Sequence, residues 1–411
     1  MSKNLYSVIT GTGSYIPTQK IPNRYFLNSE FYDVEGKKIE ISNEETIKNF
    51  EKITGIKERR YVTNDLLTSN IASYAAENCL NSSRASREDL DYIIVAHNFG
   101  DVRADNKRSD FVPSLASRVK IKLGIKNPYT VAYDLPFGCP GWLQGIIQAD
   151  SFIKSGKAKK ILVIGAETLS RISDIHDRDS MIYSDGAGSA LVEALENDKP
   201  VGILSNKTRS DSSYMLWMGK SNNPYYKGNE LFLKMYGHDV FEYAVKYVRD
   251  VVKKSLDEAN LGIRDIKKIL IHQANEKMDE SIVKWLFKLY GIKASQNDIQ
   301  EIMPMTISWL GNSSVATLPT LLDLLMKGKF NDISFSQSFE GNSVMPEIIK
   351  NVTNNGGPFG ILKAPESLTI DDSKTKNFQP NYIHKLNSGD NVVFASVGGG
   401  MNINSVVYRM P

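Results

Sequence analysis

Apolar and polar residues alternate along the first 200 residues in a pattern that predicts buried strands separated by amphipathic helices. The continuous apolar runs at 92–96 and 160–165 are typical of strands that are buried on both faces. Helical spacing of apolar residues occurs at 71–80 and 143–153. Further strands are predicted at 6–10, 130–133 and 186–194, and a short helix at 113–119. The pattern favours an α/β fold.

The rest of the chain repeats this style, starting with a long amphipathic helix at 240–258. The apolar stripe expected on that helix consists of Phe241, Val245, Val248, Val252 and Leu256. Other elements are predicted as strands at 269–271, 391–397 and 405–408 and as helices at 278–289 and 315–326. We therefore expect two pseudo-duplicated α/β halves, residues 1–200 and 201–411, although no residue-level repeat is visible.

Residues 329–387 interrupt this pattern, because they are rich in Ser, Asn, Asp, Lys and Gly. Within them only residues 344–352 have helical spacing. A connection of this length inside a compact fold is usually an insertion or a functional loop. We expect an insertion that is either a surface elaboration or part of a substrate entrance.

Composition narrows the class of protein. Of the 411 residues, 41% are hydrophobic and 24% are charged, which is ordinary for a soluble enzyme. The net charge of +3 is too small to indicate nucleic-acid binding. No apolar run approaches the roughly 18 residues of a membrane span, and the opening residues lack a signal-peptide pattern. Because Cys79 and Cys139 are the only two cysteines, we expect a cytoplasmic protein with free thiols.

Cys139 lies between a predicted strand and a predicted helix. At a helix start the sulfur lies near unpaired N–H groups and the positive end of the dipole, which lowers a thiol pKa. His272 ends an apolar strand, and Asn312 lies in a Gly-Asn-Ser-Ser motif. Together they indicate a Cys-His-Asn enzyme. Each residue alone has an ordinary explanation: a small buried hydrophobe, a hydrogen-bonded histidine and a turn.

Two glycine motifs invite a nucleotide-binding interpretation that the residues do not favour. Residues 11–13 form Gly-Thr-Gly after a strand, but the third glycine is missing and Pro17 would break the receiving helix. Residues 185–188 are not followed by the Lys-Ser/Thr of a phosphate loop. Both motifs are predicted to be turns. No metal-ligand spacing with cysteine is visible at His97, His176, His238 or His384. We expect neither a metal nor a cofactor.

A papain-like cysteine protease is the first alternative, because it also uses Cys, His and Asn. His272 follows Cys139 by 133 residues (272 − 139), within the roughly 130–150 of that family. However, the preceding cysteine of the protease signature and its position near the N-terminus are absent. The strand and helix alternation around Cys139 also argues against this interpretation.

Four sets of motifs occur in a specific order: residues 11–17 with 54–60, the Cys139 segment through 185–188, residues 272–275, and residues 311–314 with 398–400. In this order they resemble the β-ketoacyl-acyl-carrier-protein synthase III family over nearly the whole chain. The resemblance implies the thiolase fold, a layered αβαβα sandwich. It also implies a homodimer that needs no metal, flavin or nicotinamide.

The resemblance implies a decarboxylative Claisen condensation in fatty acid or polyketide-like biosynthesis. Cys139 would hold an acyl primer as a thioester, with the N–H groups of Cys139 and Gly399 as the oxyanion hole. A malonyl thioester on acyl carrier protein would lose carbon dioxide, and His272 and Asn312 would donate hydrogen bonds to the resulting enolate. The product would be a β-ketoacyl thioester.

The chain departs from the family in ways that bear on the substrate. The tryptophan that stacks on CoA in the family is replaced by Asn49, although Arg178 matches the second CoA contact, so a carrier-bound primer is favoured. Residues 111–114 align with a loop that reaches across the dimer, and Val112 stands where short-chain members have Phe. This predicts a longer primer. A docking surface for the acidic carrier protein is expected around Lys277, Lys284, Lys246, Arg249 and Lys253.

Two other functions remain open from the sequence. The first is a specialised ketosynthase that joins two fatty acyl units, for example toward a resorcinol-type lipid. The second is a Cys-dependent acyltransferase or hydrolase that does not decarboxylate its substrate. A non-catalytic binding module is disfavoured, because Cys139, His272 and Asn312 are all present.

Overall fold

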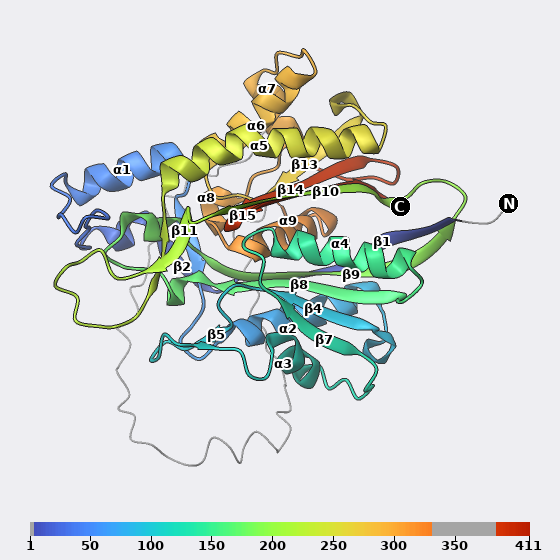
Figure 1. The fold of residues 1–411 in the computed structure, drawn as a ribbon, viewed down its shortest axis with the longest axis horizontal. Helices are drawn as coiled ribbons and strands as arrows, with labels where there is room; N and C mark the ends of the chain where they lie inside the picture. The colour runs from blue at the N-terminus through green and yellow to red at the C-terminus, as the bar shows by residue number, and fades with distance from the viewer. Residues whose placement is uncertain (1–3, 331–383) are drawn as a thin grey trace.

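Two stacked β-sheets form the centre of the protein in the computed structural model, which describes residues 4–330 and 384–411 (Figure 1). The first sheet has the strand order β1-β9-β8-β4-β7. Its strands are β1 (Asn4–Tyr15), β4 (Tyr92–Ala96), β7 (Val131–Leu135), β8 (Lys160–Thr168) and β9 (Asp185–Asn197). Strands β4, β7 and β8 are parallel, whereas β9 runs antiparallel to both of its neighbours.

The second sheet has the order β10-β15-β14-β13. Its strands are β10 (Gly202–Ser213), β13 (Ile266–Ile271), β14 (Asn391–Gly398) and β15 (Gly400–Arg409). Here β13 and β14 are parallel and β15 is antiparallel to both of its neighbours. The first sheet is thus built from residues before 200 and the second from residues after it. Two duplicated halves, 1–200 and 201–411, would produce such a pair of sheets. The division of the chain into these halves stays a prediction.

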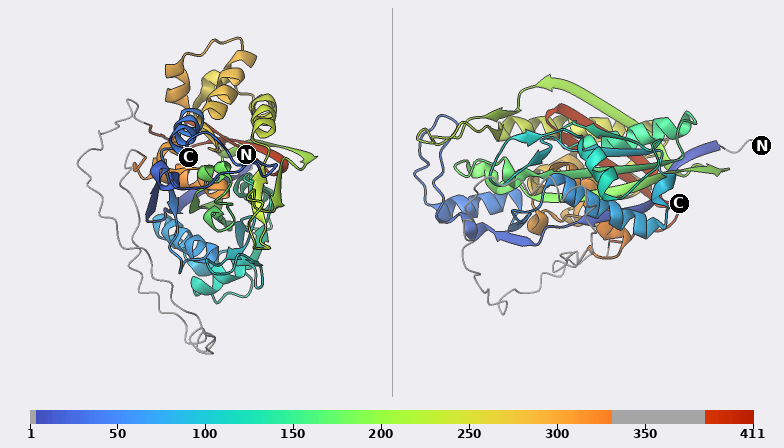
Figure 2. Two further views of the ribbon diagram at one scale, coloured as in Figure 1. Left: turned by 90° about the vertical axis from the view of Figure 1, so that its left-hand side faces the viewer. Right: turned by 90° about the horizontal axis from the view of Figure 1, so that it is seen from below.

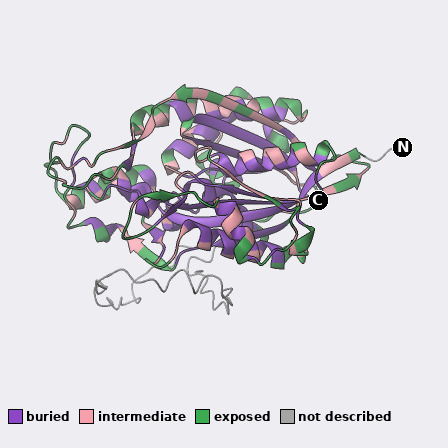
Figure 3. Cartoon of the chain, turned by 60° about the horizontal axis from the view of Figure 1, so that its bottom comes forward, coloured by how far each residue is buried: buried purple, intermediate pink, exposed green. Residues whose placement is uncertain are grey.

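Helices complete five layers, and Figures 1 and 2 show this αβαβα arrangement. Between the sheets lie α4 (Gly141–Lys154) and α9 (Thr317–Met326). The outer face of the first sheet is covered by α2 (Thr68–Ser83) and α3 (Leu115–Lys122), and that of the second by α5 (Gly237–Glu258) and α6 (Glu276–Leu289). Figure 3 shows buried strands at the centre and exposed residues on the outer helices. The layered fold implied by the motifs is confirmed.

Smaller elements surround these layers. They are β2 (Gln19–Pro22), β3 (Glu58–Tyr61), β5 (Asp101–Val102), β6 (Ser109–Asp110), β11 (Leu216–Gly219), β12 (Phe232–Met235), α1 (Asn43–Thr54), α7 (Gln296–Ile302) and α8 (Ile307–Leu310). In the part of the chain that the structure describes, no helix combines the length and the apolar character needed to cross a bilayer.

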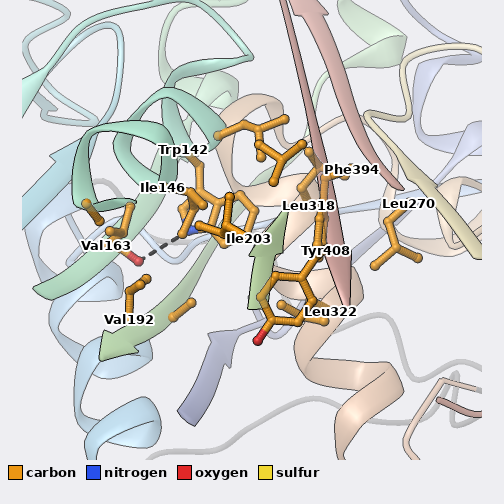
Figure 4. Close-up of a cluster of buried hydrophobic side chains, with 14 of the residues drawn as sticks. Trp142, Ile146, Val163, Val192, Ile203, Leu270, Leu318, Leu322, Phe394 and Tyr408 are labelled. Carbon is orange, nitrogen blue, oxygen red and sulfur yellow. Dashed lines mark hydrogen bonds between the residues drawn. The ribbon is translucent and has the colours of Figure 1, made fainter. Parts of the chain in front are cut away.

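The central layer is held by apolar packing around Trp142 of α4 (Figure 4). Its ring lies edge-on to Phe394 of the second sheet, with ring centroids 6.1 Å apart. Its indole N–H donates a hydrogen bond to the carbonyl of Val163 in the first sheet, at 3.2 Å. A single side chain thus joins both sheets next to the loop that carries Cys139, which makes that loop's surroundings rigid.

The prediction of turns at the two glycine motifs is wrong. Residues 11–13 lie within the continuous strand β1 and residues 185–188 within β9. A Cβ atom on Gly13 would lie 2.3 Å from a carbonyl oxygen of α2, and one on Gly188 would lie 2.6 Å from a backbone nitrogen of α9. These glycines therefore let two helices approach the sheet closely.

Several predicted boundaries also differ from the structure. The helix expected at 113–119 begins at Leu115, and the helix expected at 315–326 begins at Thr317 after a 3-10 turn. On α5 the expected stripe is rotated, because Phe241 and Val245 are only partly buried while Tyr243 and Ala244 are buried. The helix predicted at 344–352 and most of the insertion lie outside the described residues.

Candidate active site

The loop between β7 and α4 carries Cys139 at the carboxyl end of a parallel strand. The residue before it, Gly138, has a φ of +66°, a conformation that glycine adopts without steric cost. The chain therefore turns sharply and enters α4 at Gly141, two residues after the cysteine. The carboxyl ends of parallel strands are the usual place for a site in an α/β sheet.

Two glycines at the end of β14, Gly398 and Gly399, lie in close contact with the backbone of the Cys139 loop. A Cβ atom on Gly398 would lie 2.6 Å from the backbone nitrogen of Cys139. Likewise, a Cβ atom on Gly138 would lie 2.8 Å from the backbone nitrogen of Gly399. Only glycines allow this contact between the two backbones. The N–H groups of Cys139 and Gly399, for which the family resemblance implies an oxyanion hole, therefore lie in neighbouring loops.

His272 follows β13 directly, and its backbone N–H donates a hydrogen bond to the carbonyl of Ala395 in β14, at 2.8 Å. Its side chain is buried, and this burial lowers the pKa of the imidazole to about 4. The ring is therefore neutral at pH 7 and carries one N–H donor. Among the described residues, its Nδ1 atom has no hydrogen-bond partner.

Asn312 lies between α8 and α9, and its backbone is tied to the first half of the chain. Its N–H donates to the carbonyl of Ile182 and its carbonyl accepts from the N–H of Ser184, at 3.0 and 2.8 Å. The side-chain oxygen of Asn312 accepts a hydrogen bond from the N–H of Ser314 at 2.8 Å. Because the oxygen is fixed in this way, the NH₂ group is the end of the amide that can donate to a ligand.

One cavity of about 310 Å³ brings these residues together. Cys139, His272, Asn312 and Gly399 all line it, although they come from four different segments. The remaining wall is mainly apolar and includes Leu169, Leu216, Trp217, Leu233, Met235 and Met278. Four of these come from β11 and β12, two strands that the sequence did not predict. An apolar cavity with a few convergent polar groups is suited to a thioester with a hydrocarbon chain.

The predicted low pKa of Cys139 is wrong. Burial against the apolar cavity wall raises the pKa of this thiol to about 11, which outweighs the opposing effect of the Ser314 hydroxyl. That hydroxyl donates a hydrogen bond to the cysteine sulfur at 3.3 Å. At pH 7 the Cys139 side chain is therefore a neutral thiol rather than a thiolate.

The other residues that the sequence singled out lie outside this cavity. Val112 is 85% exposed, and Arg178 has an exposed side chain. On the outer layer, Lys277 and Lys284 are exposed on α6. Nearby on α5, Lys246 is exposed, the guanidinium of Arg249 lies 4.8 Å from the ring of Trp285, and Lys253 pairs with Asp257.

Sequence reasoning missed three polar residues next to the cysteine: Asn98, Glu167 and Ser314. Asn98 follows β4, and Glu167 is near the end of β8. The sequence contained a signal for Asn98 and Glu167, because both are polar residues that follow the apolar runs of parallel strands. The carboxyl ends of parallel strands meet at one edge of a sheet, where sites are usually found. Ser314 carried no comparable signal, because it reaches Cys139 from the other half of the chain.

The sequence of this chain is similar to the sequences of known proteins. Residues 133–212 match the family model of 3-oxoacyl-[acyl-carrier-protein (ACP)] synthase III. A β-ketoacyl-[acyl-carrier-protein] synthase III of Xanthomonas campestris pv. campestris is 33% identical over 335 residues, which cover 79% of this chain and 90% of that protein.

Two solved structures share the fold. The 3-oxoacyl-[acyl-carrier-protein] synthase III of Aquifex aeolicus has a TM-score of 0.69 at 24% identity, covering 98% of this chain and 99% of that one. The priming β-ketosynthase of the R1128 polyketide biosynthetic pathway has a TM-score of 0.69 at 20% identity, covering 100% and 98%. Given its identity to the Xanthomonas protein over most of both chains, this chain belongs to the β-ketoacyl-[acyl-carrier-protein] synthase III family.

Proposed function

We propose that the protein condenses an acyl primer, carried on Cys139, with a malonyl-type thioester of acyl carrier protein, and releases carbon dioxide. One observation carries this proposal: Cys139, Gly399, His272 and Asn312 all line one largely apolar cavity, where they can serve as nucleophile, oxyanion-hole partner and neutral donors. The two free thiols of the described chain are compatible with a reducing compartment, so we propose that the reaction takes place in the cytoplasm.

In the first step the Cys139 sulfur attacks the carbonyl carbon of the primer thioester. A new S–C bond forms, the old one breaks, and the proton of Cys139 leaves with the departing thiol. The N–H groups of Cys139 and Gly399 donate hydrogen bonds to the carbonyl oxygen as negative charge develops on it. Because the pKa of the thiol is raised, little thiolate is present at pH 7. Hydrogen-bond donors to the sulfur and to the carbonyl oxygen must therefore lower the activation barrier of acylation.

In the second step the malonyl unit loses carbon dioxide, and an enolate forms. The N–H of His272 and the NH₂ of Asn312 donate hydrogen bonds to the enolate oxygen. Both groups are neutral at pH 7, and the Asn312 amide is held in place by Ser314, so they need no reorganisation as charge develops. The enolate carbon then attacks the acyl group, and the sulfur of Cys139 departs.

The test of this function is incubation with primer and malonyl thioesters of carrier protein, followed by mass spectrometry of protein and products. We expect an acyl adduct on Cys139, release of carbon dioxide and a β-ketoacyl product. An adduct on Cys139 without loss of carbon dioxide would instead identify an acyltransferase or hydrolase.

We also propose that the protein is a homodimer. Strand β7 is the outermost strand of its sheet, and the apolar side chains of Tyr129 and Val131 beside this edge are 85% and 47% exposed. An exposed edge strand with apolar neighbours is a template for pairing with another strand. The loop that carries Val112 projects near the same edge, and Arg118 holds it through the carbonyls of Val112 and Pro113.

Within such a dimer, Val112 would contact the partner's acyl pocket, and its small side chain would accommodate a primer longer than acetyl. We therefore expect Val112→Phe to shift the preference toward short primers without slowing decarboxylation. Loss of two buried methylenes, each worth about 0.8 kcal/mol, changes the ratio of rates about tenfold. Competition between mixed acyl thioesters measures this ratio. Val34→Phe, at another exposed valine, is the control.

A strong preference of the unmodified enzyme for acetyl-CoA, together with no effect of Val112→Phe, would refute this role of Val112. The same competition compares CoA with carrier-bound primers. Carrier-bound primers should be preferred, because Asn49 offers no aromatic face to the adenine that Arg178 would contact.

The acidic carrier protein is expected to dock on the basic face of α6 and α5. Reversal of charge by Lys277→Glu with Lys284→Glu should raise the KM for carrier-bound substrate roughly tenfold at low salt, because attraction becomes repulsion. Steady-state kinetics at two salt concentrations measure the effect. Lys199→Glu, an exposed lysine between β9 and β10, is the matched control. An unchanged KM at low salt would exclude this surface.

A further inference from the structure

A chain of partly buried hydrogen bonds lies behind Cys139 and begins at the buried Glu167 of β8. One oxygen of its carboxylate accepts two hydrogen bonds from Asn98, from the backbone N–H at 3.0 Å and from the side-chain NH₂ at 2.7 Å. Glu167 is 1% exposed, and Asn98 follows the neighbouring parallel strand β4. The carboxylate therefore fixes which way the Asn98 amide points, because only the NH₂ end of an amide can donate.

From Asn98 the chain continues to the sulfur. The same NH₂ group donates to the hydroxyl oxygen of Ser314 at 3.4 Å, and this hydroxyl donates to the sulfur of Cys139 at 3.3 Å. A serine hydroxyl has a single hydrogen. Asn98 occupies one of the two lone pairs of this oxygen, and the single hydrogen of the hydroxyl is left to donate to the sulfur. The contact with Asn98 thus orients Ser314 for donation to Cys139.

The backbone of Ser314 is held in an unusual conformation at this point. Its φ is +53°, in the left-handed region that residues other than glycine rarely adopt. The N–H of Ser314 donates to the side-chain oxygen of Asn312, which fixes this conformation. Strained backbone of this kind is maintained where the surrounding structure requires it, and it is concentrated at functional sites.

We propose that Ser314 is a further catalytic residue that stabilises negative charge on the Cys139 sulfur, and that Asn98, anchored by Glu167, is a positioning residue acting through Ser314. This inference rests on the proposed role of Cys139 as the nucleophile. The sulfur gains negative charge twice in a cycle, when it loses its proton during acylation and when it departs after condensation. A directed hydroxyl donor lowers the cost of both events.

The ionisable groups that face the thiol set the direction of the expected effect. They are Glu167 from β8, Tyr183 from the first half and His272 from the second. Burial raises the pKa of Glu167 to about 7, so its carboxyl group is ionised above that pH, where its negative charge raises the pKa of Cys139, whereas the Ser314 hydroxyl lowers the pKa of Cys139. His272 is neutral, because burial lowers its pKa. Loss of the Ser314 hydroxyl should therefore raise the thiol pKa and slow reactions of the thiolate.

The experiment measures alkylation of Cys139 by iodoacetamide between pH 7 and pH 9.5, with peptide mass mapping. The buried Cys79 is an internal reference for global opening of the fold. Ser314→Gly removes the hydroxyl, and glycine suits the left-handed backbone without strain. We expect alkylation about tenfold slower at each pH, because the variant lacks one hydrogen bond that stabilises the thiolate. Ser313→Ala, a buried neighbour paired with Thr317 instead, should alkylate at the wild-type rate.

Asn98→Ala tests the positioning role. It should slow alkylation about threefold, because the hydroxyl is still present but is free to turn away. The double variant Asn98→Ala with Ser314→Gly should be no slower than Ser314→Gly alone, because both changes act through one hydroxyl. A wild-type rate for Ser314→Gly across this pH range, or additive losses in the double variant, would overturn the proposal.

Alkylation requires no acyl substrate, so this test is separate from the test of the proposed function. The variants could alkylate as expected while the wild-type enzyme releases no carbon dioxide from malonyl thioesters. That result would support the role of Ser314 and Asn98 and refute the proposed condensation. If condensation occurs and the variants alkylate at the wild-type rate, the reverse conclusion holds.

Discussion

Cys139→Ala is expected to carry no acyl group and to form no condensation product, because alanine lacks the sulfur that binds the primer in the proposed mechanism. The fold should be retained, since only one atom is removed from a partly exposed site, and the change in unfolding free energy should stay within about 1 kcal/mol. Intact-protein mass spectrometry after incubation with an acyl thioester detects the adduct, and urea unfolding checks the stability.

The matched control is Cys79→Ala, at the other cysteine of the chain. Cys79 is buried in α2 and does not line the cavity, and burial raises the pKa of its thiol to about 12. This variant should be acylated like the wild-type enzyme. A Cys139→Ala protein that still accumulates an acyl adduct and condenses it at the wild-type rate would show that another residue is the nucleophile.

His272→Ala and Asn312→Ala are each expected to slow decarboxylative condensation by about 100- to 1000-fold, because each removes one preorganised donor to the enolate oxygen. Acylation of Cys139 should be affected less, since in the proposed mechanism its oxyanion is bound by the backbone N–H groups of Cys139 and Gly399. The two steps are measured separately, as self-acylation by mass spectrometry and as carbon dioxide release from malonyl thioester.

The pKa of His272 adds a pH criterion to this prediction. Because burial lowers this pKa to about 4, the imidazole stays neutral from pH 6 to pH 8, and condensation should show no inflection from His272 in that range. His238→Ala, at an exposed histidine, serves as the control. Equal losses of acylation and condensation in His272→Ala would instead make His272 the base that activates Cys139.

Much of the fold and part of the site could be predicted from the sequence, because the signals involved are local. Buried strands and amphipathic helices leave a period in the order of apolar residues, so the runs at 92–96 and 160–165 and the helix at 143–153 were predicted within a few residues. Cys139, His272 and Asn312 were predicted as site residues from their places beside such elements and from the order of the motifs that resemble the family, and the structure brings them to one cavity.

Other features depend on contacts between segments that are distant in the chain. The glycines at 11–13 have the composition of a turn, and only the approach of α2 explains their place inside β1. The sequence predicted a low thiol pKa for Cys139 from the dipole of a single helix. In the structure the thiol pKa is raised, because cavity residues from both halves of the chain shield the sulfur from water. Asn98 and Ser314 are 216 residues apart, and no local pattern relates them. Periodicity reports what a residue does within its own element, but hydrogen bonds and burial at a site arise only when the elements pack together.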